Sequence, residues 1–195
     1  MKRFLKFSSI AIEKAFIKDY DCRSVIVMRF GLWMAAILYA VFGILDYFLM
    51  PLSYWEIWAI RFVIVIPVIF LTLFLTYINS INMYMQAIMS FSSVIMGLGI
   101  VAMLAISHES EPGFRFYYAG MMLVIMAICS IFRLRFYYAL FTSLVIIAGY
   151  EFTAICIQKI VRGDLSGLNC RIFINNNFFF ISSNIIGLMA SYYAE

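Results

Sequence analysis

Six long runs of apolar residues, separated by short polar links, constrain the fold of this chain more than any other feature of its sequence. A run of about 20 apolar residues is long enough to cross the hydrocarbon core of a bilayer as a helix. In hydrocarbon, unpaired backbone groups are so costly that only helices and closed barrels span it. The runs are continuous and do not alternate with polar residues, which favours helices. The predicted spans cover residues 30–50, 57–78, 83–106, 116–132, 136–157 and 172–193.

The composition excludes the other fold classes. Of the 195 residues, 66% are hydrophobic and 12% are charged, whereas a soluble domain carries about 25% charged residues. The many aromatic residues also exclude a disordered chain. Because the links are too short for a further domain, we predict an all-α membrane protein. A cytoplasmic juxtamembrane segment would cover residues 1–29, and a six-helix transmembrane domain would cover residues 30–195.

The segment before the first span has the pattern of a short amphipathic helix. Its apolar residues recur at helical spacing, which is typical of a helix lying on the membrane surface. A loosely ordered tail is the alternative. Charges at positions 13 and 14 interrupt the apolar core that a signal peptide needs, so we expect the segment to be retained. The apolar positions are Ile12, Phe16, Ile17 and Tyr20.

The basic residues predict the orientation, because cytoplasmic loops carry an excess of Lys and Arg. With the amino terminus inside, nine of the 14 basic residues lie on the cytoplasmic side, and both termini are cytoplasmic. The net charge of +4 is then a topological signal rather than a nucleic-acid-binding surface. The inner set is Lys2, Arg3, Lys6, Lys14, Lys18, Arg23, Arg29, Arg133 and Arg135, and the outer set is Arg61, Arg115, Lys159, Arg162 and Arg171.

Four cysteines are scattered along the chain. Cys156 and Cys170 both fall near the outer ends of predicted spans, where a disulfide could close the outer loop if that side is oxidising. The alternative is that both are free, packed thiols. No cysteine or histidine spacing matches a metal site, so we expect no metal and no cofactor.

Two charges fall at similar depth in the first predicted hairpin. Asp46 lies four residues before the end of the first span, and Arg61 lies four residues into the second. Because ionisable groups in a membrane need partners, we predict an ion pair. It would either fix the hairpin or contribute to a ligand site.

Other polar residues gather in the outer half of the predicted bundle, while the inner half of every span is nearly without charge. This asymmetry predicts a polar pocket that could bind a ligand. Hydrogen bonding between helices is the alternative explanation. The candidate residues are Asp46, Arg61, Arg115, Glu151, Asn175, Asn176 and Asn177.

Transport and catalysis have little support in the sequence. A transporter needs polar groups through the midplane, and the midplane here offers mainly serines and threonines, so small-solute transport is a third hypothesis. The single histidine, His108, falls in an outer turn as a solvated loop residue. No catalytic residues are identified.

The last predicted span carries a face of small residues. Ser183, Gly187 and Ser191 recur at intervals of four, a spacing that lets two helices approach closely. This face would pack either in a dimer or against another span of the same chain.

Several motifs in the second half of the chain carry a resemblance to a known family. They are Tyr118-Ala-Gly120, the turn at 133–136, Tyr150-Glu151, the segment from Asn176 to Gly187, and the terminal Ser191-Tyr-Tyr-Ala-Glu195. As a set they resemble the six-helix membrane anchor of bacterial class III adenylate and guanylate cyclases. The likeness is clearest over residues 115–195 and extends weakly to Arg29, Asp46 and Arg61. Similar anchors are shared with some diguanylate cyclases and sensor kinases.

The resemblance implies a receptor-like module in a bacterial inner membrane. In the family, the last helix continues into a cytoplasmic linker and a catalytic domain that is active as a homodimer. This chain stops at Glu195, where the linker would begin, so no catalytic residue can be carried over and we expect the effector beyond it. We predict that a lipophilic ligand in the membrane shifts the last helix. A passive anchor that only brings effector domains together is the alternative.

Overall fold

The computed structural model describes residues 10–159 and 168–194. Within these residues the structure is all-helical, with 87% of them in helices. In chain order, the elements are α1 (Ile10–Leu49), α2 (Tyr54–Trp58), the π-helix η1 (Ala59–Val65), α3 (Ile66–Leu75), the 3₁₀-helix η2 (Asn79–Tyr84), α4 (Met85–Ile106), α5 (Gly113–Phe116), α6 (Tyr118–Ser130), α7 (Phe136–Phe152), the π-helix η3 (Thr153–Ile157) and α8 (Leu168–Ala194).

Six helical segments are long and apolar enough to cross a membrane, which confirms the predicted six-helix class. The second span combines α2, η1 and α3, the fourth combines α5 and α6, and the fifth combines α7 and η3. The chain is therefore a multi-pass membrane protein. The segments are Ser24–Leu49, Tyr54–Leu75, Ile81–Ile106, Gly113–Ser130, Phe136–Ile157 and Cys170–Tyr193.

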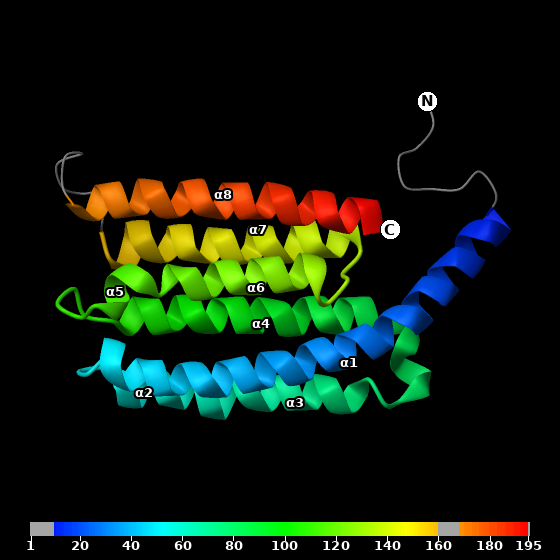
Figure 1. Cartoon of the computed structure of the whole chain (residues 1–195), viewed down its shortest axis with the longest axis horizontal. Helices are drawn as coiled ribbons and strands as arrows, with labels where there is room; N and C mark the ends of the chain where they lie inside the picture. Colours follow the sequence, from blue (N-terminus) through cyan, green and yellow to red (C-terminus); the bar gives the residue numbers. More distant parts are fainter. Residues whose placement is uncertain (1–9, 160–167, 195) are drawn as a thin grey trace.

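The spans lie side by side as one bundle with α4 in the middle (Figure 1). Helix α4 packs against α3, α6 and α7, and α8 lies at the edge against α6 and α7. Accordingly, 61% of the span of α4 is buried in the protein and only 22% of the span of α8. Helix α8 ends at the same end of the bundle where α1 begins, as an even number of crossings requires (Figure 1).

The amphipathic segment and the first span form one helix. Helix α1 runs for 40 residues without a break, and its first turns extend away from the bundle (Figure 1). The structure does not describe the side chains of Phe16, Ile17 and Tyr20. It also does not describe the residues Lys2, Arg3, Lys6 and Arg162. Contact of this segment with the membrane surface therefore stays a prediction.

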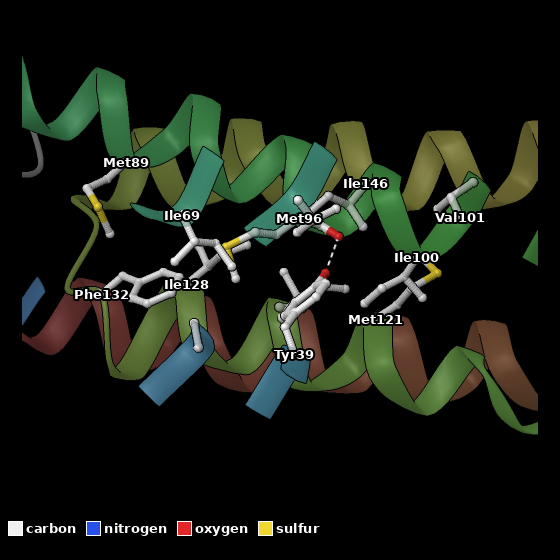
Figure 2. Close-up of a cluster of buried hydrophobic side chains, with 14 of the residues drawn as sticks. Tyr39, Ile69, Met89, Met96, Ile100, Val101, Met121, Ile128, Phe132 and Ile146 are labelled. Atoms are coloured by element: carbon white, nitrogen blue, oxygen red, sulfur yellow. Dashed lines mark hydrogen bonds between the residues drawn. The ribbon is translucent and has the colours of Figure 1, made fainter. Parts of the chain in front are cut away.

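Small residues on α4 let its neighbours approach closely. A Cβ at Gly97 would overlap the side chain of Ile146 of α7, and one at Gly99 would lie 2.6 Å from Cγ2 of Val65. Figure 2 shows Met96 and Ile146 side by side in the buried cluster, with the hydroxyl of Tyr39 donating to the carbonyl of Met96 at 2.5 Å. This hydrogen bond ties α1 to the central helix.

The small-residue face of α8 packs within the chain. A Cβ at Gly187 would lie 2.9 Å from Sγ of Cys129 on α6. Ser191 donates to the carbonyls of Cys129 and Leu134 at 3.3 Å each, whereas Ser183 donates to the carbonyl of Phe179 one turn earlier in α8 itself. Of the two alternatives for this face, the structure shows packing inside the bundle at Gly187 and Ser191, and a dimer contact stays a prediction. Sequence spacing indicates close approach but not which helix approaches.

Cys156 and Cys170 are free thiols in the structure, which is the second of the two alternatives for them. Cys156 lies exposed in η3, whereas Cys170 is buried at the start of α8. Their side chains occupy different environments, although both lie near the same end of the bundle.

Gly97→Ala tests the close contact between α4 and α7. The added Cβ forces Ile146 to move in a packed core, which should cost about 1–3 kcal/mol of stability. Gly120→Ala is the matched control, because the nearest side-chain atom, Cδ1 of Ile100, is 3.4 Å from the added Cβ. Thermal unfolding in detergent should show a lower Tm for Gly97→Ala alone. An unchanged Tm would contradict this packing.

Candidate functional site

Asp46 and Arg61 form a buried, bidentate ion pair. Nε of Arg61 donates to Oδ2 of Asp46 at 2.6 Å, and Nη2 donates to Oδ1 at 2.8 Å. The exposed fractions of the two residues are 1% and 4%. Two charges in an apolar interior need such geometry to offset the loss of hydration. The ion pair predicted for the first hairpin is therefore present.

Three further residues complete the environment of this pair. Tyr117 donates its hydroxyl to Oδ1 of Asp46 and accepts from Nη2 of Arg61 at 3.4 Å. Nη1 of Arg61 donates to the carbonyl of Tyr39 at 3.2 Å, and Nη2 lies 3.6 Å from Sδ of Met103. The guanidinium carbon also lies 5.4 Å from the centre of the Tyr39 ring. The pair thus joins α1, η1, α4 and the start of α6.

The backbone around Arg61 is π-helical because of a proline that follows it. Arg61 lies in the π-helix η1, and Pro67 follows at the start of α3. Proline has no N–H and so cannot bond to the carbonyl four residues earlier, which disturbs the regular α-helical pattern before it. Short π-helical segments occur frequently at functional sites. Here the segment holds Arg61 toward Asp46.

A groove of about 360 Å³ extends from this ion pair along the bundle. Helix α1 forms one wall, α5 and α6 form the other, and α4 contributes Met96 and Ile100. Its walls are almost entirely apolar, and small residues such as Gly120 and Ala127 keep it open. Leu38 and Leu123 line it and are 44% and 49% exposed, so the groove borders the lipid-facing surface. Apolar clefts with a few polar groups are typical of ligand sites.

A second polar cluster lies between α7 and α8. The amide of Asn176 donates to the hydroxyl of Tyr150 at 3.0 Å, and both residues are buried. The ring of Tyr150 packs edge-on against Phe180 at a centroid distance of 4.8 Å. Next to it, Glu151 follows Tyr150 in α7, and the side-chain amide of Asn177 donates to the carbonyl of Phe173 at 3.2 Å. One carboxyl oxygen of Glu151, Oε1, is buried with no partner among the described residues.

Two consecutive tyrosines connect the clusters. Tyr117 bonds to Asp46 at the end of the groove. The ring of Tyr118 packs edge-on against Phe180 of α8 at 6.3 Å. Because consecutive residues of a helix point about 100° apart, the start of α6 contacts both the groove and α8.

The structure divides the predicted pocket. The Asp46 pair and the Asn176 cluster are separate, and neither Glu151 nor the asparagines line the groove. Arg115 and Asn175 are exposed, and the structure gives them no hydrogen bond to either cluster. The structure thus places these seven residues in two clusters and on the exposed surface, because helix rotation turns Arg115 and Asn175 outward, and ligand binding by them stays a prediction. Within the described residues, no group of His, Cys, Asp and Glu could hold a metal ion.

Sequence reasoning missed three residues of importance. Tyr39 and Tyr117 complete the ion-pair site, and the only signal for Tyr117 was its place in a tyrosine pair. Glu111 falls in a polar turn but is 2% exposed. It accepts hydrogen bonds from the backbone N–H groups of Leu52, Ser53 and His108 and from the Ser53 hydroxyl, at 2.8 to 3.1 Å. This carboxylate fastens the turn between the first two spans to the loop between the third and fourth spans.

Breaking the ion pair should destabilise the protein more than removing both charges. Asp46→Leu leaves Arg61 buried without a partner, which should cost about 3–5 kcal/mol, and Arg61→Met should cost a similar amount. The double variant Asp46→Leu/Arg61→Met should lose less than either single variant. Thermal unfolding of the three variants measures the coupling, with the exposed Arg115→Met as control. Additive losses would contradict the coupling.

Glu111 should make the contact between these two loops sensitive to acid. Burial raises the pKa of Glu111, but the four hydrogen bonds outweigh this effect and lower the pKa below its ordinary value of 4.5. Its stabilising effect is therefore complete above that value and is lost as the pH falls through the lower folded-state pKa. The difference in Tm between the wild type and Glu111→Gln should shrink as the pH is lowered from about 7 to about 3. A difference that does not change with pH would exclude this role.

Comparison with known proteins identifies the family to which this chain belongs. A model of the MASE8 family matches residues 44–195, a range that contains Asp46, Arg61, Tyr117 and the Asn176 cluster but not Tyr39 or most of the α1 wall of the groove. No match is found among curated proteins or among solved structures. The match covers well over half of the chain and includes the region where the sequence resembled cyclase anchors. The chain belongs to the MASE8 family, a family of membrane-associated sensor domains.

Proposed function

We propose that this chain is the membrane anchor and receptor domain of a class III nucleotide cyclase. A lipid or lipophilic ligand acts on it, and α8 passes the change to a catalytic domain on the cytoplasmic side. Membership of MASE8 supports this proposal, since such domains occur typically in cyclases and other signalling proteins. The residue motifs of the second half of the chain support the cyclase class in particular.

The observation that carries the proposal is the contact made by the start of α6. Tyr117 touches the ion pair at the end of the groove, and Tyr118 touches Phe180 of α8. A change in the groove that rotates or shifts α6 would therefore move α8. A ligand produces such a change only if it binds one arrangement better than the other.

The proposed orientation places both termini in the cytoplasm of a bacterial inner membrane. The excess of basic residues near the inner ends of the spans supports it, and so does the position of both helix ends at one end of the bundle (Figure 1). The groove would then end on its ion pair near the outer leaflet. A signal would cross the membrane along α8.

The proposed partner is a second copy of the parent protein. Helix α8 offers its lipid-facing side for this contact, because its small-residue face is occupied by α6. Phe178 and Ile185 lie on the outward side, 66% and 55% exposed. Dimerisation of catalytic domains would then depend on the spacing and rotation of the two α8 helices.

A fusion to the catalytic domain of a class III cyclase tests the function. Cyclase activity of the fusion in membrane vesicles should change at least about threefold with added membrane lipid extract, which needs only a modest difference in affinity between two states. Asn176→Ala removes the hydrogen bond to Tyr150 and should reduce this response. Its neighbour Asn175→Ala is the matched control, because Asn175 is exposed and outside both clusters.

A constant activity with every extract would favour a passive anchor over a receptor. Glu151→Gln provides a second variant in the same cluster and should reduce the response as Asn176→Ala does. If both variants respond like the wild type, α7 and α8 do not carry the signal in the proposed way. Saturable solute uptake by proteoliposomes would instead favour transport.

A further inference from the structure

The groove between α1 and α6 cannot stay empty in a membrane. Its walls are apolar and part of its lining faces lipid, so an acyl chain of the bilayer enters it at little cost. The apolar walls therefore do not distinguish one chain from another. Any preference among occupants must come from the polar end, where Asp46, Arg61 and Tyr117 line the groove.

The ion pair leaves one donor of Arg61 unused among the described residues. Nη1 of Arg61 has two N–H groups, and its one hydrogen bond in the described structure goes to the carbonyl of Tyr39. Nε and Nη2 are both engaged by the carboxylate of Asp46. The oxygen of a hydroxyl group can accept from the remaining N–H of Nη1 without adding a charge.

The charges at this end are already balanced. Arg61 and Asp46 neutralise each other, and no other ionisable group lies among the residues that line the groove, apart from tyrosine hydroxyls. A carboxylate head group would approach Asp46 and an ammonium head group would approach Arg61, each adding an unpaired charge in a medium of low dielectric constant. An uncharged head group avoids this cost.

The length of the groove indicates a single long chain. On α1 its lining runs from Gly31 to Leu49, a helical distance on the order of 27 Å at 1.5 Å per residue. One leaflet of a bilayer supplies hydrocarbon of about 15 Å. The groove therefore accommodates an extended chain longer than a leaflet is deep.

We propose that the groove between α1 and α6 binds a long-chain amphiphile with an uncharged, hydroxyl-bearing head group, held by Arg61 while Asp46 balances its charge. This inference rests on the proposed receptor function for its biological meaning, but the binding itself does not require an effector domain. The hydroxyl oxygen accepts from Nη1 of Arg61, while the chain lies along the groove.

Photolabelling of the purified chain tests this site. The protein is placed in nanodiscs of phosphatidylcholine with a hexadecan-1-ol that carries a photoreactive diazirine in its chain. Mass spectrometry then measures the labelling of α1 and α6. Unlabelled hexadecan-1-ol should compete at least about tenfold better than hexadecane or hexadecanoate, because hydrogen bonds to charged groups are among the stronger ones.

Two substitutions make the result specific. Gly120→Leu fills the groove and should abolish the labelling, whereas Ala190→Leu, an equivalent enlargement on the exposed side of α8, should leave it unchanged. Asp46→Asn leaves Arg61 with an unbalanced charge and should move the preference from the alcohol toward hexadecanoate. If Asp46→Asn does not fold, the Gly120→Leu comparison and the three competitors still decide the question.

Equal competition by all three compounds would overturn the proposal, because the groove would then hold any bilayer chain. Labelling that survives Gly120→Leu would overturn it as well. These results are independent of the cyclase fusion. Specific labelling without any change in cyclase activity would uphold the binding site and refute the receptor function. A lipid response of the fusion without specific labelling would uphold the receptor function and refute the binding site.

Discussion

The ion pair of Asp46 and Arg61 is the interaction on which the rest of this structure depends. A charge in a membrane interior is stable only with a partner and with further hydrogen bonds. The bond between Asp46 and Arg61 fixes the register of α1 against η1. The carbonyl of Tyr39 and the hydroxyl of Tyr117 supply the further hydrogen bonds. Four segments from the first two thirds of the chain thus meet at one point. Their apolar surfaces alone would not fix that register, since lipid tails are as apolar as the side chains.

The same interaction explains why a groove persists beside it. Tyr117 holds the start of α6 close to α1 at the ion pair, while small residues further along α6, such as Gly120 and Ala127, do not fill the space between the two helices. Helix α4 lies behind the groove and packs tightly against α7. The groove is therefore bounded by a rigid centre on one side and by lipid on the other.

The sequence predicted those features that depend on depth in the membrane and missed those that depend on helix rotation. The six spans and the Asp46–Arg61 pair follow from run lengths and from the geometry of a short hairpin. Tyr117 stands in a pair of tyrosines, and nothing in such a pair tells which of them faces inward. The structural role of Glu111 could not be predicted from its own polar turn, because partners of its carboxylate come from another loop. The face of Ser183, Gly187 and Ser191 indicated close packing, but the identity of the neighbouring helix is decided by the whole bundle.

Helices α6 and α8 should move together, and this has a consequence for signalling. Gly187 allows close contact with Cys129, and Ser191 bonds to backbone carbonyls at the far end of α6, while Tyr118 packs on Phe180 near the other end. An occupant that changes the separation of α1 and α6 would then shift α6 and α8 as one body against α1, α3 and α4. Since only α8 continues toward the proposed effector, the tight pairing of α6 with α8 would convert a local change in the groove into displacement of the last helix.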